Sequence, residues 1–234
     1  MRVSTNTQIA EDTMAPHAIL FDMDGLLLDT EKVCLDSFVE TRRQFSLSDS
    51  PDVFMRCVGV RLPECDRIIQ ESLPDQVAFK DFNDTWRERI SATLRHDIPL
   101  KAGALQLFQI LASKGYLMGV ATSTQTEVAK SHLEKTGLLP FLGGVIGGDN
   151  VQEGKPNPEV YHKIAKHLGV SAADCVAFED SETGTRAALA SGATTVQIPD
   201  LIPPSAEMLK SGHVIAPSLL EGALKVELIE TSDI

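Results

Sequence analysis

The chain of 234 residues is 43% hydrophobic and 23% charged, a composition typical of a globular protein with enough sequence for one large domain or two modest ones. Its formal net charge of −12 is spread along the chain, which argues against the basic surface that a nucleic-acid-binding protein needs. No apolar run approaches the roughly 20 residues that span a bilayer, and residues 1–16 lack the apolar centre of a signal peptide, so we expect a cytoplasmic protein without a membrane partner.

The first expected strand is the apolar run from Ala18 to Phe21, which follows a polar segment, residues 1–14, that we expect to be a disordered tail. A run without polar alternation suits the middle of a parallel sheet, where both faces are covered. Asp22 and Asp24 follow directly, and Gly25 permits a sharp turn. Because buried unpaired carboxylates are costly, the two aspartates should lie near a cation or at an open strand end.

A helical region then interrupts the strand pattern. Residues 32–98 carry amphipathic, charge-rich patterns such as "CDRIIQESL" and "FNDTWRERISATL", and Pro99 and Gly103 mark the return to strands. We therefore expect an all-helical cap domain at residues 32–98, inserted into a core formed by residues 15–31 and 99–234.

The remaining strands alternate with helices. Short apolar runs that begin at Leu117, Cys175 and Thr194 predict strands, and "GGVIGG" predicts a further short strand. Between them lie helical patterns such as the one that starts at Val160 and the segment "TRAALASG", which ends at a capping glycine. This alternation predicts an α/β core with a doubly wound parallel sheet and right-handed crossovers.

Polar residues follow several of these strands. Ligands of doubly wound sheets bind beyond the carboxyl ends of the strands. Asp22 and Asp24 follow the first strand, and three further groups should meet them there: Thr122 and Ser123, Lys155 in the loop "GKPNP", and Glu179 with Asp180. Carboxylate oxygens suit Mg²⁺, while hydroxyls, backbone N–H groups and an ammonium suit a phosphate.

Two roles can be assigned from this chemistry. Asp22 is the candidate nucleophile, because a carboxylate beside Mg²⁺ and Lys155 stays ionised and can form an aspartyl phosphate. Asp24 could protonate the leaving alcohol and later activate water. Gly25 would bring a backbone N–H close to the phosphate.

Four segments, "DMDGLLLDTE", "ATST", "GKPNPEVY" and "FEDSETG", resemble in order the four motifs of the haloacid-dehalogenase-like superfamily. The resemblance implies a Rossmann-like core, a helical cap after the first motif, Mg²⁺ and phosphoryl transfer through an aspartyl phosphate. It implies that Asp22 is the nucleophile and Asp24 the acid and base. It further implies that Thr122 and Lys155 bind phosphate and that Asp180, with Glu179, holds the metal beside Asp22 and the Asp24 carbonyl.

Three chemistries remain open within this resemblance. A Mg²⁺-dependent phosphatase acting on a small metabolite, such as a sugar phosphate or phosphoglycolate, is the reading that we favour. A β-phosphoglucomutase is the nearest alternative, but Cys34 stands where that family has histidine, and Arg61 in "VGVRLPE" is one residue early. A catalytically silent binding protein is the third, although Asp22, Asp24, Lys155 and Asp180 are all present.

The cap should close over the site and set specificity, and we expect Arg61 and Arg87 to contact the substrate. A cap of this size suits a small phosphorylated metabolite, and no obligate protein partner is evident. The sequence names neither the substrate nor the oligomeric state.

Overall fold

The computed structural model describes residues 16–58 and 62–234 of the chain. The expected disordered tail, residues 1–14, and Arg61 lie outside these described residues. Among the described helices, none combines the length and the apolar character needed to cross a membrane. The four cysteines are free thiols, in agreement with the absence of a paired spacing in the sequence.

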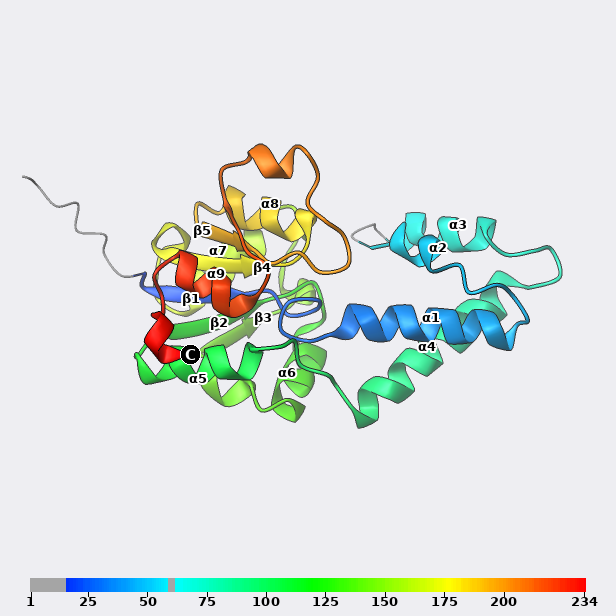
Figure 1. Ribbon diagram of the computed structural model, residues 1–234, viewed down its shortest axis with the longest axis horizontal. Helices are drawn as coiled ribbons and strands as arrows, with labels where there is room; N and C mark the ends of the chain where they lie inside the picture. The colour runs from blue at the N-terminus through cyan, green and yellow to red at the C-terminus, as the bar shows by residue number, and fades with distance from the viewer. Residues whose placement is uncertain (1–15, 59–61) are drawn as a thin grey trace, which may run out of the picture.

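The core is built on a six-stranded parallel sheet in the order β3-β2-β1-β4-β5-β6 (Figure 1). The predicted α/β class, with its parallel sheet, is confirmed. The five expected strands, from Ala18, Leu117, Cys175 and Thr194 and in "GGVIGG", are all present. No pattern in the sequence predicts the sixth strand, which has two residues. The strands are β1 (Ala18–Phe21), β2 (Leu117–Ala121), β3 (Gly144–Ile146), β4 (Cys175–Glu179), β5 (Thr194–Gln197) and β6 (Val214–Ile215).

Two layers of helices cover the sheet (Figure 1). Ile19 and Phe21 of β1 pack among the side chains of one layer, and the Phe21 ring lies 4.9 Å from that of Phe108. Ala18 and Leu20 face the other layer. Both faces of β1 are therefore buried, which explains its unbroken apolar sequence. The first layer contains α5 (Ala104–Ser113), α6 (Thr126–Lys135) and α9 (Leu219–Lys225), and the second contains α7 (Glu159–His167) and α8 (Glu182–Ala190).

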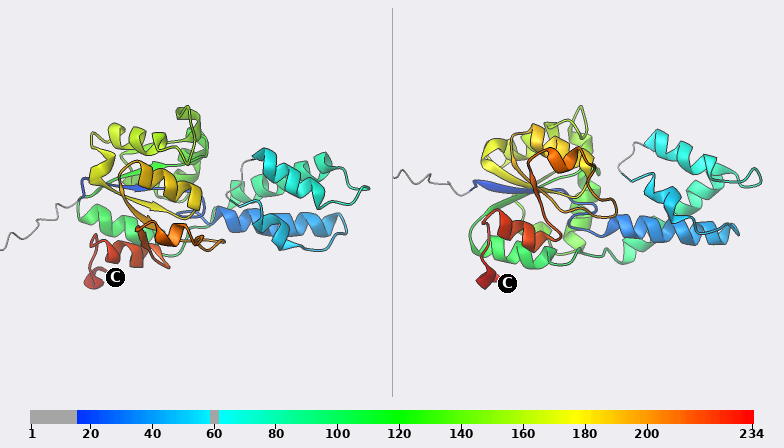
Figure 2. Two further views of the ribbon diagram at one scale, coloured as in Figure 1. Left: turned by 90° about the horizontal axis from the view of Figure 1, so that it is seen from above. Right: turned by 45° about the horizontal axis from the view of Figure 1, so that its top comes forward.

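Four helices form a separate unit beside this core (Figures 1 and 2). Phe82 and Trp86 are four residues apart on α4, so they share one helix face and pack edge-on against Phe38 of α1, with ring centroids 5.7 and 5.5 Å away. This small aromatic core is distinct from those that flank the sheet. The helices are α1 (Thr30–Gln44), α2 (Pro51–Met55), α3 (Leu62–Glu71) and α4 (Phe79–His96).

Two chain segments join the helical unit to the core, and they are held side by side. Leu28 and Leu100 form an antiparallel bridge, and the Asp29 N–H donates to the Pro99 carbonyl at 2.8 Å. The Lys101 ammonium contacts the Asp29 carboxylate at 2.7 Å. Helix α1 begins at Thr30, two residues before the expected start of the cap, and the division at residues 32 and 98 stays a proposal.

Short 3-10 helices complete the connections between the main elements. They are η1 (Leu139–Phe141), η2 (Gly148–Asn150), η3 (Ala172–Asp174), η4 (Met208–Lys210) and η5 (Thr231–Asp233).

Candidate active site

Polar residues from the ends of neighbouring strands line one cavity of about 380 Å³. Strand β1 ends at Phe21, β2 at Ala121 and β4 at Glu179, and the parallel register places these ends at the same edge of the sheet. The cavity brings together six of the residues that the sequence singles out: Asp22, Asp24, Thr122, Ser123, Lys155 and Asp180. Glu179 is fully buried beside them, below the cavity surface.

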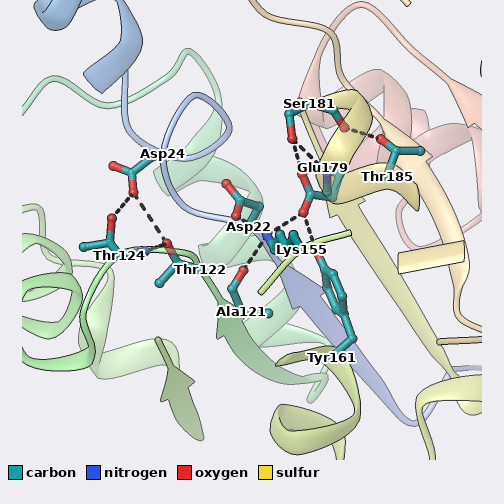
Figure 3. Close-up of polar contacts among 11 residues, drawn as sticks. Asp22, Asp24, Ala121, Thr122, Thr124, Lys155, Tyr161, Glu179, Ser181 and Thr185 are labelled. Carbon is teal, nitrogen blue, oxygen red and sulfur yellow. Dashed lines mark hydrogen bonds and ion pairs between the residues drawn. The ribbon is translucent and has the colours of Figure 1, made fainter. Parts of the chain in front are cut away.

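Lys155 is the centre of the hydrogen-bond network at this edge (Figure 3). Its ammonium contacts the Asp22 carboxylate, and it donates to the Glu179 carboxylate at 2.6 Å and to the Ala121 carbonyl at 3.0 Å. Its side chain is 6% exposed. The loop is fixed by Glu159, which opens α7 and accepts the N–H groups of residues 152 and 153 at 2.9 Å.

Burial strongly perturbs the ionisable groups. It raises the pKa of Asp22 to about 8, against the opposing attraction of Lys155 and with a further contribution from Glu179. Burial also raises the pKa of Asp180 well above its usual range, with Asp22 and Glu179 adding to the effect. Burial disfavours the Lys155 ammonium, but attraction to Asp22 and Glu179 outweighs it and raises the pKa of Lys155. One ammonium is thus set against three close carboxyl groups, and a bound cation would favour their ionised forms.

The donor set suits a hard divalent cation. Asp22, Glu179 and Asp180 each offer a carboxylate oxygen, and these oxygens lie within 4.8 Å of one another. A Cβ at Gly25 would stand only 2.4 Å from the Asp180 Oδ2 atom, so this glycine, at φ +84°, keeps the space beside that oxygen open. All-oxygen sites with few protein ligands are typical of Mg²⁺.

The three carboxylates are not equally available. One Glu179 oxygen already accepts hydrogen bonds from Lys155 at 2.6 Å and from the Tyr161 hydroxyl at 2.5 Å. Its other oxygen lies 3.4 Å from the Ser181 hydroxyl, and that hydroxyl also caps α8 by accepting the Gly184 N–H at 3.0 Å. Glu179 is therefore tied into the protein, whereas Asp180 faces the cavity.

Asp24 points away from this network (Figure 3). Its Oδ2 atom accepts from Thr124 at 2.7 Å and lies 3.5 Å from the Thr122 hydroxyl. Its Oδ1 atom accepts from Thr30 at 2.9 Å, and Thr30 is the first residue of α1. The Asp24 side chain thus touches both the core and the helical unit.

The expected phosphate-binding groups are differently placed within the cavity. Thr122 is buried, and its hydroxyl accepts the Thr124 N–H at 3.1 Å, which fixes the turn after β2. Ser123 is exposed on the cavity wall. Together with Lys155, these residues supply hydrogen-bond donors around Asp22, as an anionic ligand requires.

Arg87 does not line the cavity of about 380 Å³ described above, which we call the Asp22 cavity. It lies on α4 at the edge of a neighbouring cavity of about 240 Å³, whose walls include Cys34 and Trp86. Glu31 and Val58 line both cavities, so the two adjoin. The other expected cap contact, Arg61, lies outside the part of the chain that the structure describes.

Four residues near the site were not anticipated from the sequence. Tyr161 supports Glu179, Thr30 and Thr124 hold Asp24, and Glu31 lies on the cavity wall. Burial, with the negative charges of Asp24 and Asp200 adding to it, raises the pKa of Glu31 to about 7. All four stand in the quoted motif segments: Thr30 and Glu31 end "DMDGLLLDTE", Thr124 ends "ATST" and Tyr161 ends "GKPNPEVY".

The chain is similar to known sequences over the segment that contains the four motifs. Residues 19–198 match the family described as haloacid dehalogenase-like hydrolase. The phosphorylated carbohydrates phosphatase of Thermotoga maritima is 29% identical over 175 residues, which cover 75% of this chain and 81% of the relative. The fructose-1-phosphate phosphatase of Escherichia coli is 28% identical over 182 residues, which cover 77% and 95%.

A solved structure extends the likeness to the whole fold. An inferred beta-phosphoglucomutase from Thermotoga maritima superimposes with a TM-score of 0.77 at 25% sequence identity. The match covers 92% of this chain and all of the other.

Proposed function

The chain belongs to the haloacid dehalogenase-like hydrolase family, and from this premise we propose that it is a Mg²⁺-dependent phosphatase of a small phosphorylated carbohydrate. The observation that carries the proposal is the contact of Lys155 with Asp22 and Glu179, next to Asp180. The cavity at this contact is also lined by hydroxyl-bearing residues. Relatives described as phosphatases of phosphorylated carbohydrates and of fructose 1-phosphate support the substrate class.

In the proposed reaction, an Asp22 carboxylate oxygen attacks phosphorus, and the bond from phosphorus to the ester oxygen breaks. Asp24 gives a proton to the departing alcohol. Asp24 then takes a proton from water, whose oxygen attacks the aspartyl phosphate, and this releases inorganic phosphate and restores Asp22. The Asp24 carboxyl must leave its threonine partners to reach the reacting atoms.

The surrounding residues position and neutralise the phosphoryl group. Thr122, Ser123 and the Gly25 N–H would bind its oxygens together with Lys155. Asp22, Asp180 and the Asp24 carbonyl would hold Mg²⁺, with Glu179 beside them, and this cation would supply positive charge for the oxygens of the transition state.

The helical unit is proposed to act as the cap that excludes water and selects the substrate. Arg87 supports this role, because the cavity that it lines adjoins the Asp22 cavity through Glu31 and Val58. Arg61 stays a proposal on the sequence alone.

A second candidate is phosphoryl transfer between sugar carbons, as in a β-phosphoglucomutase. The Thermotoga maritima structure favours it at the level of fold. Cys34, which replaces the histidine of that family, lines the Arg87 cavity, where burial raises the pKa of its thiol to about 12. A neutral thiol does not replace an imidazole as an acid or base near neutral pH, so hydrolysis is the better-supported reaction.

Phosphate release from a panel of small esters, with and without Mg²⁺, tests the proposal. The panel should contain fructose 1-phosphate, glucose 6-phosphate, β-glucose 1-phosphate, glycerol 3-phosphate and phosphoglycolate. We expect release that requires Mg²⁺ and is lost in Asp22→Asn, whereas the exposed Asp36→Asn retains it. Conversion of β-glucose 1-phosphate to glucose 6-phosphate without release would instead establish the mutase, and no turnover of any ester would contradict both.

A further inference from the structure

Asp200 lies beside the acidic cluster but outside the motifs that identify the family. It follows β5 in the segment "QIPD", two residues beyond the end of the family match at residue 198. Its side chain is 13% exposed. The same position over Gly25 is approached by two carboxylates: a Cβ there would lie 2.4 Å from the Asp180 Oδ2 atom and 3.4 Å from the Asp200 Oδ2 atom.

The two oxygens of Asp200 have different surroundings. Oδ1 accepts from the Lys101 ammonium at 2.5 Å, and Lys101 in turn contacts Asp29 at 2.7 Å. Oδ2 is buried and has no hydrogen-bond partner among the described residues. Lys101 therefore fixes the carboxylate so that its free oxygen is directed toward Gly25 and Asp180.

We propose that Asp200 is a positioning residue for the divalent cation, and that its Oδ2 atom accepts hydrogen bonds from water molecules which the cation carries. The inference rests on the proposed function, because it takes the cation to be bound by Asp22 and Asp180. Mg²⁺ usually keeps several of its waters in proteins, and carboxylates that bind such outer ligands orient the site. Gly25 makes the arrangement possible, since a Cβ there would clash with the Asp180 carboxylate and contact that of Asp200.

Two features of the structure separate this role from simple support of Lys101. Asp29 also contacts Lys101, so both aspartates share the same structural bridge. Asp200, however, lines a cavity together with Asp180 and Glu31, whereas Asp29 does not. A purely structural bridge would make the two aspartates equivalent, while a role toward the cation singles out Asp200.

Titration calorimetry of the metal-free full-length protein with Mg²⁺ distinguishes the two roles. In Asp200→Asn an amide replaces one acceptor oxygen, and we expect the Mg²⁺ dissociation constant to rise about tenfold. The matched variant Asp29→Asn loses the same charge and the same lysine contact, and we expect its dissociation constant to stay within about twofold of the wild-type value. Asp200→Glu keeps a carboxylate and should bind Mg²⁺ more tightly than Asp200→Asn.

Unchanged Mg²⁺ affinity in a folded Asp200→Asn protein would overturn the inference, as would an equal loss in Asp29→Asn. Circular dichroism checks that each variant is folded. If Asp200→Asn does not fold, Asp200→Glu takes its place: its longer side chain displaces the free oxygen, so it should bind Mg²⁺ more weakly than Asp29→Asn, and equal affinities would overturn the inference. Failure of the proposed function looks different, because the wild-type protein itself would then show neither Mg²⁺ binding nor Mg²⁺-dependent phosphate release.

Discussion

The Lys155 ammonium contacts the Asp22 carboxylate, although the two residues lie 133 positions apart in the chain. Their side chains are 6% and 9% exposed, and the same ammonium reaches the fully buried Glu179. Removal of the lysine would leave two buried carboxylates without their counter-charge. The proposed chemistry and the stability of the core therefore depend on one side chain.

Lys155→Met tests this dependence. Breaking a buried ion pair by removing one partner costs about 3 to 5 kcal/mol, so we expect the free energy of unfolding in urea to fall by that amount. Phosphate release should fall by at least about 100-fold, as for the loss of a transition-state donor. Lys130→Met is the matched control, because Lys130 pairs with Glu127 at an exposed position and should change neither value. An active Lys155→Met protein with wild-type stability would contradict this account of the site.

Tyr161→Phe removes the hydroxyl that donates to Glu179 at 2.5 Å. Hydrogen bonds to charged groups are worth about 1.5 to 3 kcal/mol, so we expect the unfolding free energy to fall within that range. Tyr116→Phe serves as the control, since Tyr116 is a partly buried tyrosine that packs against the sheet core, away from Glu179. Equal effects of the two substitutions would show that the hydroxyl of Tyr161 has no special role.

The raised pKa of Asp22 predicts how stability depends on pH. Because burial raises this pKa from 3.8 to about 8, the metal-free folded protein binds more protons than the unfolded chain between these values. Its stability should therefore fall as the pH rises across this interval and level off above about 8. Mg²⁺ competes with these protons, so the rise in melting temperature at a fixed Mg²⁺ concentration should be larger at pH 8 than at pH 6. A rise that shrinks with increasing pH would contradict the assignment of Asp22 to the cation.

Arg87→Ala tests the proposed role of the helical unit in substrate selection. Loss of one charge-assisted hydrogen bond of about 1.4 kcal/mol corresponds to a tenfold increase in KM, and we expect kcat to change little because Arg87 lies outside the Asp22 cavity. Arg67→Ala is the control on α3, where the arginine pairs with Glu64 and Glu71 at the surface. Unchanged KM in Arg87→Ala for the best ester of the panel would remove Arg87 from the site.

The sequence was sufficient for five of the six strands of the parallel sheet, because each of these five carries a local signal. The run from Ala18 to Phe21 is apolar throughout, and the structure buries both of its faces. Acidic or hydroxyl residues follow three of the strands, and parallel pairing alone brings them to one edge. Strand β6 escaped prediction because two residues carry no periodicity.

The rest of the site depends on tertiary packing that local sequence does not encode. Tyr161 lies on the buried face of an ordinary amphipathic helix, and only its contact with Glu179 distinguishes it from a core residue. Asp180 follows β4 directly, whereas Ile198 and Pro199 separate Asp200 from the end of β5, so the rule of polar strand ends does not single it out. Its relation to Lys101 joins residues 99 positions apart.

Trapping of the covalent intermediate tests the central claim, that Asp22 is the nucleophile. The protein is mixed with Mg²⁺ and the best ester of the panel, quenched in acid within the first turnovers, reduced with borohydride and digested for mass spectrometry. The account predicts that reduction of an aspartyl phosphate converts residue 22 to homoserine, and that Asp22→Asn protein gives no such product. Rapid turnover with an unmodified residue 22, or with the modification at Asp24 or Asp180, would contradict it.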